Sequence, residues 1–180
     1  MSEQLDALKR VLQKDRKLLN FKKAFEGNPA FSMSFVDLHE ELDTLHSTRS
    51  VRTLRRKKGS DFAEEVLDSM LQDQATRSRC AEILGACVKV RGSIAETLDN
   101  LRDYLIVTYS SKLKLIGGTQ AERKAFVESV MRRFYKFLTE VAQLEEHCKV
   151  IITDIDKAGF TYTNIVETVK ILSAPERVRL

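Results

Sequence analysis

The sequence predicts an all-α protein built around a long antiparallel helical hairpin, and three observations support this class. The chain of 180 residues contains only seven Gly and two Pro, too few for the many tight turns of a sheet fold. Hydrophobic residues at 43% are enough for a core, and charged residues at 31% are typical of long exposed helices. The third observation is an apolar repeat of seven residues in the C-terminal half.

This apolar repeat runs through residues 119–157 and forms two rows. The first row contains Val127, Phe134, Val141, Cys148 and Ile155. The second row contains Val130, Phe137, Leu144, Ile151 and Ala158. Apolar steps that alternate between three and four residues place both rows on one face of a helix, which must be buried against another helix. We therefore expect one coiled-coil-like helix over 119–157.

Shorter helices are expected before the hairpin. Residues 3–26 have leucines on one side and basic residues around the remainder, as in a basic amphipathic helix. Such a helix packs on its own core, contacts nucleic acid or lies on a membrane, and the interspersed acidic residues and the lack of Trp argue against the membrane. Gly27-Asn28-Pro29 ends this helix, and Ser34 begins a short helix that continues to Leu45.

The first limb of the hairpin is expected over residues 76–115. An acidic amphipathic helix over 61–73 comes directly before it. Gly85 and Gly92 lie seven residues apart inside the limb, where each costs about 1 kcal/mol relative to Ala. We expect this pair to allow a neighbouring helix to approach closely.

Glycines mark both ends of the second limb. Gly117 and Gly118 provide the hairpin turn, and Thr119 with Glu122 has the spacing of a capping box. Residues 158–160 (Ala-Gly-Phe) are expected to end the limb, with the Phe folding back as a hydrophobic staple. A short C-terminal helix then follows and stops before Pro175.

Positive charge is concentrated in the N-terminal third. Residues 1–58 hold thirteen Lys/Arg against eight Asp/Glu, whereas residues 59–180 hold seventeen against eighteen. We therefore divide the chain into a basic N-terminal helical arm (1–58) and a helical hairpin core with its C-terminal helix (59–180).

One short segment, residues 47–60, contains six basic residues and no acidic one. These residues are Arg49, Arg52, Arg55, Arg56, Lys57 and Lys58. A run of this kind binds phosphates of nucleic acid, because Lys and Arg release condensed counterions. Two alternatives are a solvated linker and a strap lying on an acidic face of the same fold. The next segment, 61–73, carries five acidic residues and no basic one, so it is the candidate for that face.

Patterns that would indicate an enzyme or a metal centre are missing, and no catalytic residue, cofactor or metal is expected. His39 and His46 share a helical face at seven-residue spacing, but metal ligands on a helix need a spacing of four or further ligands nearby.

The three cysteines (Cys80, Cys87 and Cys148) lie on apolar helical faces, as buried thiols do. No apolar run approaches the ~18 residues of a membrane span. We expect a soluble, cytoplasmic protein.

Two short stretches carry a family resemblance. The sequence Arg102-Asp103-Tyr104, followed by Tyr109-Ser110-Ser111-Lys112, precedes a Gly-containing loop, and a later helix closes in Ile155-Asp156-Lys157-Ala158-Gly159-Phe160. Over roughly residues 95–172 this arrangement resembles the T4-type phage recombination mediator. The resemblance implies a ring-like oligomer that binds single-stranded DNA and helps to load recombinase onto strands coated by single-strand-binding protein. It places a basic DNA-contacting patch on Arg102, Lys112 and Lys114.

We therefore expect a self-associating, non-enzymatic accessory factor in recombination or replication that binds single-stranded nucleic acid without sequence preference. The contacts would come from the basic run and from the tip of the hairpin, where tyrosines accompany lysines and aromatic stacking can join phosphate neutralisation. A recombinase or a single-strand-binding protein is a further candidate partner. The alternative is a structural or adaptor protein, such as a phage assembly component or a small subunit of a larger complex, in which the basic run is a strap.

Overall fold

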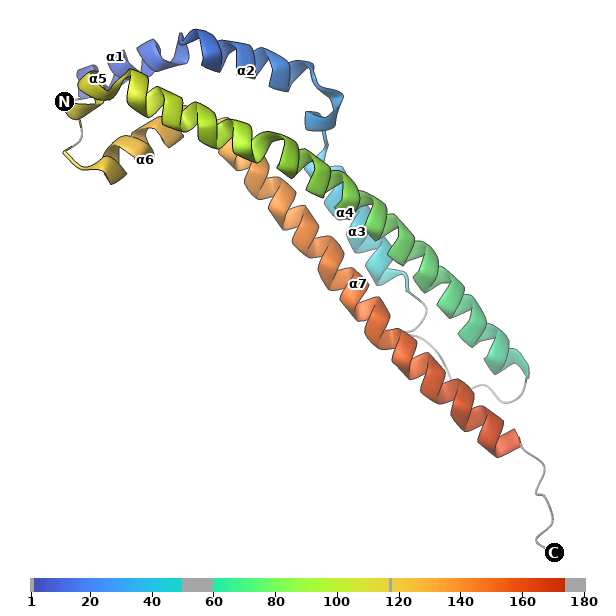
Figure 1. The fold of residues 1–180 in the computed structure, drawn as a ribbon. Helices are drawn as coiled ribbons and strands as arrows, with labels where there is room; N and C mark the ends of the chain where they lie inside the picture. The colour runs from blue at the N-terminus through green and yellow to red at the C-terminus, as the bar shows by residue number, and fades with distance from the viewer. Residues whose placement is uncertain (1, 50–59, 117, 174–180) are drawn as a thin grey trace, which may run out of the picture. The chain divides into compact units, whose positions relative to one another are not determined.

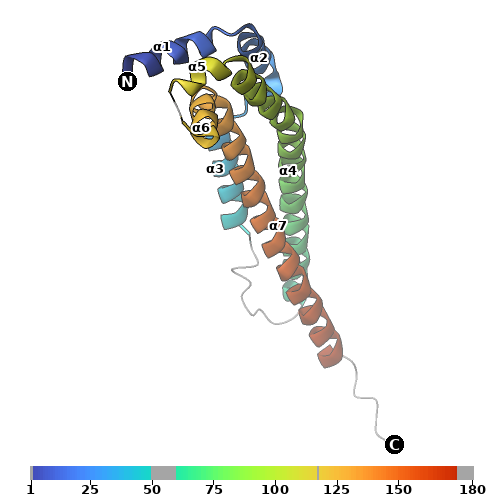
Figure 2. The same ribbon diagram turned by 60° about the vertical axis from the view of Figure 1, so that its left-hand side comes forward.

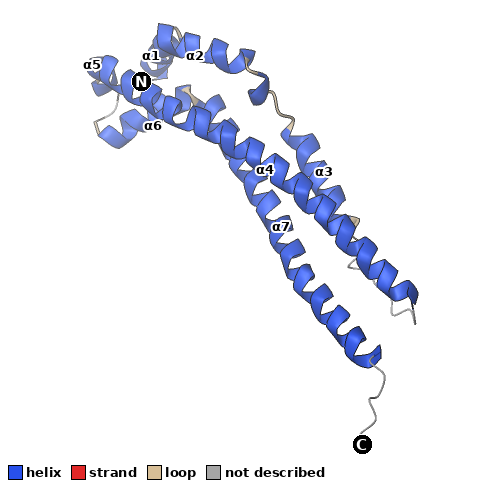
Figure 3. Ribbon diagram, turned by 45° about the vertical axis from the view of Figure 1, so that its right-hand side comes forward, coloured by secondary structure: helices blue, strands red, loops and turns tan. Residues whose placement is uncertain are grey.

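The computed structural model describes residues 2–49, 60–116 and 118–173, and every regular element in these ranges is helical (Figures 1 and 3). The elements are α1 (Ser2–Gln13), α2 (Arg16–Gly27), η1 (Pro29–Phe31), α3 (Phe35–Ser47), α4 (Ser60–Thr108), α5 (Ser110–Lys114), α6 (Gln120–Val130) and α7 (Arg132–Ser173). The predicted all-α class with two long helices and shorter N-terminal helices is confirmed.

Contacts between residues divide the chain into two compact units. Unit 1 consists of Met1–Phe35 with Ala86–Gln143, and unit 2 consists of Val36–Gly85 with Leu144–Leu180. Because α4 and α7 are long, each contributes one segment to each unit. Both units combine residues of the predicted arm with residues of the predicted core. The predicted boundary after residue 58 itself lies outside the described residues.

The seven-residue repeat is buried as predicted. All five residues of the first row are at most 6% exposed, and the central three residues of the second row are at most 7% exposed. On α4, the matching positions Cys80, Cys87, Ile94 and Leu101 are buried as well. Within unit 2 the segments of α4 and α7 lie side by side in two views (Figures 1 and 2), with Arg77 of α4 hydrogen bonded to Asp156 of α7.

The predicted helix over 3–26 is two helices rather than one, and Asp15 is the reason. The Asp15 carboxylate accepts hydrogen bonds from the backbone N–H groups of Lys17 (2.8 Å) and Leu18 (3.2 Å). It therefore caps α2, with φ and ψ values of −59° and 134° that no α-helix continues. Two separate amphipathic helices result, which contact each other, and α1 also contacts α6.

The acidic helix and the first limb, which were predicted as separate helices, form the single helix α4. Neither Gly nor Pro lies near the expected break, and the buried face continues across it through Val66, Asp73, Thr76 and Cys80. The predicted close approach at Gly85 and Gly92 is wrong, because a Cβ atom added at either position would meet no other described residue within 4 Å beyond the local helix backbone.

The second limb also differs from the prediction at both ends. The capping box of Thr119 and Glu122 is present and begins α6, but the helix is interrupted at the buried residue Met131 (φ −94°, ψ 9°) before α7 begins. At the other end, α7 continues through Gly159 to Ser173 instead of breaking there. A single Gly costs a helix only about 1 kcal/mol, and the buried side chains of Ile155 and Tyr162 on either side preserve the apolar face. Phe160 is 74% exposed and forms no staple.

Candidate nucleic-acid interface

The two units carry opposite charge. Unit 1 holds seventeen Lys/Arg against ten Asp/Glu. The described part of unit 2 (36–49, 60–85 and 144–173) holds six Lys/Arg against fifteen Asp/Glu. Unit 1 thus contains the basic helices α1 and α2 together with the C-terminal part of α4, α5 and α6. Of the predicted contact residues, Arg102 lies on α4, and Lys112 and Lys114 lie on α5. A polyanion would be attracted to unit 1.

A buried carboxylate holds the two N-terminal helices on the end of α4. Asp15 is 8% exposed, and one of its oxygens accepts hydrogen bonds from the hydroxyls of Tyr109 (3.0 Å) and Tyr104 (3.4 Å). Burial, followed by the hydrogen bond to Asp15, raises the pKa of Tyr109, so its hydroxyl stays a donor. The Lys17 ammonium lies 3.8 Å from the centroid of the Tyr104 ring. Both hydroxyls are therefore bound to Asp15, and Lys17 covers one face of the Tyr104 ring.

Seven cations line the exposed side of α1, α2 and the short connection between these helices. They are Lys9, Arg10, Lys14, Arg16, Lys17, Lys22 and Lys23. Within the described ranges, none of the seven forms an ion pair. Glu26, an acidic residue of α2, is instead paired with Arg133 of α7 at 2.7 Å. The positive charge of these two helices is thus available to solvent or to a ligand.

The three cations of the predicted hairpin patch have different environments. Arg102 is only 15% exposed in its side chain and pairs with Asp99 (2.7 Å) and Asp103 (2.9 Å). The hydrogen bond to Asp103 is the largest cause that raises the pKa of Arg102. The two carboxylates neutralise the charge of Arg102 locally. Lys112 and Lys114 are exposed on α5. Lys112 also lines a groove of about 400 Å³ together with residues of α1, which brings it close to the seven cations.

Arg49, the first residue of the predicted basic run, belongs to unit 2 and is buried. Its side chain is 0% exposed and donates to both oxygens of Asp73 (2.6 and 2.9 Å) and to Asp154. The hydroxyl of Tyr162 donates to Asp73 as well (3.4 Å). In this arrangement Arg49 cannot reach a phosphate, and its contact with Asp73 is of the kind that a strap on segment 61–73 would make.

The remainder of the run lies outside the described residues. Its members are Arg52, Arg55, Arg56, Lys57 and Lys58. Their assignment as phosphate contacts stays a prediction.

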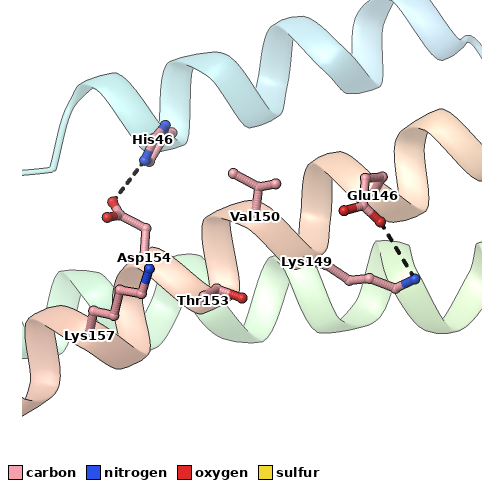
Figure 4. Close-up of a pocket in the computed structure, with 7 residues that line it drawn as sticks. All are labelled: His46, Glu146, Lys149, Val150, Thr153, Asp154 and Lys157. Atoms are coloured by element: carbon pink, nitrogen blue, oxygen red, sulfur yellow. Dashed lines mark hydrogen bonds and ion pairs between the residues drawn. The ribbon is translucent and has the colours of Figure 1, made fainter.

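The histidines contact residues far away in the sequence. His39 of α3 is hydrogen bonded to His147 of α7, and His46 to Asp154, as Figure 4 shows for the second pair. Both contacts link residues 108 positions apart, so spacing along the chain gave no signal for them. No group of three or more potential metal ligands occurs in the described part of the chain. The prediction that the three cysteines are buried thiols is confirmed, and they form no disulfide.

Comparisons with known proteins returned no match, whether with family models, curated proteins or solved structures. None of the described helices is long and apolar enough to cross a membrane.

Proposed function

We propose that this chain is a non-enzymatic accessory factor that binds single-stranded nucleic acid mainly through phosphate contacts from unit 1. The observation that carries the proposal is the set of seven exposed cations on α1, α2 and their connection, without ion-pair partners among the described residues. Exposed Lys and Arg without acidic partners release counterions when they meet a phosphate chain, and this release dominates non-specific affinity.

Lys112 and Lys114 extend this surface toward α5, and the run over 52–58 is a second candidate contact. Because the exposed cations are more numerous here than the tyrosines, we expect phosphate contacts to provide most of the affinity. Binding should then be independent of base sequence. The preference for single strands, self-association and a role in recombination or replication, with recombinase or single-strand-binding protein as a partner, rest on the resemblance to phage recombination mediators.

A salt titration tests the proposal. We would measure the affinity for a short labelled oligonucleotide at several salt concentrations, for the wild type and for the triple variant Arg10→Gln, Arg16→Gln, Lys23→Gln. Each lost phosphate contact reduces the magnitude of the slope of log K against log salt by about 0.7 on a single strand. The triple variant should therefore bind more weakly, with a slope smaller by about 2.

A matched control changes three cations of unit 2, namely Arg77, Lys149 and Lys157, to Gln. Two of these already pair with acidic residues, Arg77 with Asp156 and Lys149 with Glu146. This control should bind as the wild type does. An equal loss in both variants, or no binding of the wild type at low salt, would contradict the proposal. A duplex of the same sequence shows whether single strands are preferred.

A second candidate function, an adaptor that docks to another protein, has one observation in its favour. In unit 2, Met70 (41% exposed) and Phe160 (74% exposed) line a groove of about 520 Å³ with Ile155. Large exposed apolar side chains of this kind are typical of interaction surfaces. Light scattering with and without nucleic acid separates the candidates. Self-assembly that nucleic acid neither changes nor requires, and that Phe160→Ser abolishes, favours the adaptor.

A further inference from the structure

The contact between α3 and α7 in unit 2 contains all three histidines of the chain. His39 and His46 lie on α3, and His147 lies on α7. Leu42 of α3 is fully buried, and so are Cys148 and Ile151 of α7. Polar and apolar contacts therefore hold α3 in place jointly, and loss of the polar contacts would weaken the cover over this core.

The pair of His39 and His147 can hold only one proton between its two facing nitrogens. The Nδ1 atoms lie 2.8 Å apart, and the rings are stacked with centroids 5.1 Å apart and an interplanar angle of 17°. The Nε2 atom of His147 faces the carboxylate of Asp43 at 3.4 Å, which favours a proton on that nitrogen. In neutral His147, Nδ1 is then the acceptor, and Nδ1 of His39 is the donor.

We propose that His39 and His147 form a pH-sensitive latch, which holds α3 on α7 while at least one of the two rings is neutral and releases α3 when both rings are protonated. If both rings were charged, two N–H groups would lie head to head at 2.8 Å and two positive rings would be stacked. The pair can relieve this repulsion only by separating. While one ring is neutral, that ring can carry its single proton on Nε2 and accept a hydrogen bond from the Nδ1–H group of the charged ring, so the latch opens only when both rings are charged.

The surroundings of His147 favour its neutral form. Burial is the largest cause that lowers the pKa of His147, and Asp43 opposes it while His39 and His46 add to it. A histidine with a lowered pKa binds its proton more readily in the unfolded or open state. Its contribution to stability is therefore complete above the ordinary pKa of about 6.5 and is lost as the pH falls below that value.

The other charged groups at this contact respond differently. The nitrogen of His46 that faces Asp154 lies 3.0 Å from that carboxylate, so protonation of His46 strengthens the contact. The pKa of Asp154 is lowered, first by the hydrogen bond to His46, so the carboxylate stays charged in mild acid. On α4, Arg79 holds Glu41 of α3 at 2.6 Å and lowers its pKa, so this pair also persists. Burial raises the pKa of the Cys80 thiol, which stays neutral.

Acidification therefore has opposite effects at the two ends of the histidine contact. The pair at His39 and His147 separates, whereas His46 and Arg49 remain bound to Asp154. We therefore expect α3 to open locally around His39 and Leu42 at acidic pH, while its C-terminal end stays bound.

Hydrogen exchange of the α3 amides at about pH 7.5 and about pH 5.5 tests the latch, after correction for the pH dependence of intrinsic exchange. In the wild type, protection around residues 39–43 should fall by up to about tenfold per pH unit below about 6.5, which is the limit for uptake of one proton. In His147→Asn, where the amide occupies the position of Nδ1 but does not titrate, the fall should disappear.

His46→Gln is the matched control, because it removes another histidine from the same contact but leaves the latch. This variant should keep the fall in protection around residues 39–43. The proposal is overturned if wild-type protection is the same at both pH values, or if the fall persists in His147→Asn. A titration of the histidine ring resonances in the wild-type protein gives a test without substitutions: His147 must titrate below the ordinary histidine pKa. Neither measurement involves nucleic acid, so the latch and the proposed function fail independently.

Discussion

At the scale of single residues, Arg49 shows how one side chain changes its role with its surroundings. In the sequence it is the first member of a basic run, whereas in the structure it neutralises the buried carboxylate of Asp73. Its two-pronged contact to Asp73 has the parallel geometry in which guanidinium binds carboxylate most strongly.

Replacement of Arg49 by Ala should lower the free energy of unfolding by about 3–5 kcal/mol, because it leaves the buried carboxylate of Asp73 without its cation. Denaturant unfolding followed by circular dichroism measures the change. Arg77→Ala is the control, since Arg77 and Asp156 are 44% and 50% exposed and a surface pair contributes about 0–1 kcal/mol. Similar losses in the two variants would show that Arg49 does not stabilise unit 2 through a buried charge.

Some residues of the candidate interface and of the histidine contact can be predicted from the sequence, and others cannot. The charge of Lys112 and Lys114 and their exposure follow from composition and helical position. The roles of Asp15 and His147 do not, because each depends on partners about 90 or more residues away, and no local pattern encodes such a contact.

At the scale of elements, local rules predicted where most helices begin but not where all of them end. The Thr119 capping box and the Asn28-Pro29 stop were recognisable because each uses side chains a few residues apart. The continuation of α7 through Gly159 was not, because the packing of Ile155 and Tyr162 outweighs the weak helix propensity of one Gly.

Gly92→Ala should stabilise the protein by about 0.5–1 kcal/mol. The helix interior disfavours Gly by that amount, and a Cβ at residue 92 would meet no other described residue within 4 Å beyond the local helix backbone. Gly85→Ala, equally open, should give a similar gain. Thermal unfolding of the two variants measures the effect. Destabilisation in either variant would instead indicate that a helix approaches there closely, as the sequence alone had suggested.

At the scale of the whole molecule, the two units differ more in net charge than residues 1–58 and 59–180 do. The predicted N-terminal arm contains the basic helices α1 and α2 and the acidic helix α3. The contacts assign α1 and α2 to unit 1 and nearly all of α3 to unit 2. Unit 1 contains the seven exposed cations of α1, α2 and their connection, and unit 2 contains most of the acidic residues.

This separation predicts where an oligonucleotide acts. Amide chemical shifts of residues 2–35 and 86–143 should change on addition of a short single strand, whereas those of the described residues of unit 2 should remain nearly constant. A heteronuclear NMR titration at low salt measures both sets in one experiment. Changes confined to unit 2 would contradict a phosphate contact from α1 and α2.

The sequence by itself determined the helical class, the buried seven-residue rows, the capping box and the state of the cysteines. These features depend on periodicity and on neighbours within a few positions, which the order of residues specifies directly. Only the tertiary structure decided that Arg49 is buried, that Asp15 binds two tyrosines, that His39 meets His147 and that α1 and α2 belong to one unit with α5 and α6. Each of these depends on side chains brought together from distant parts of the chain, because burial and pairing are properties of the packed helices.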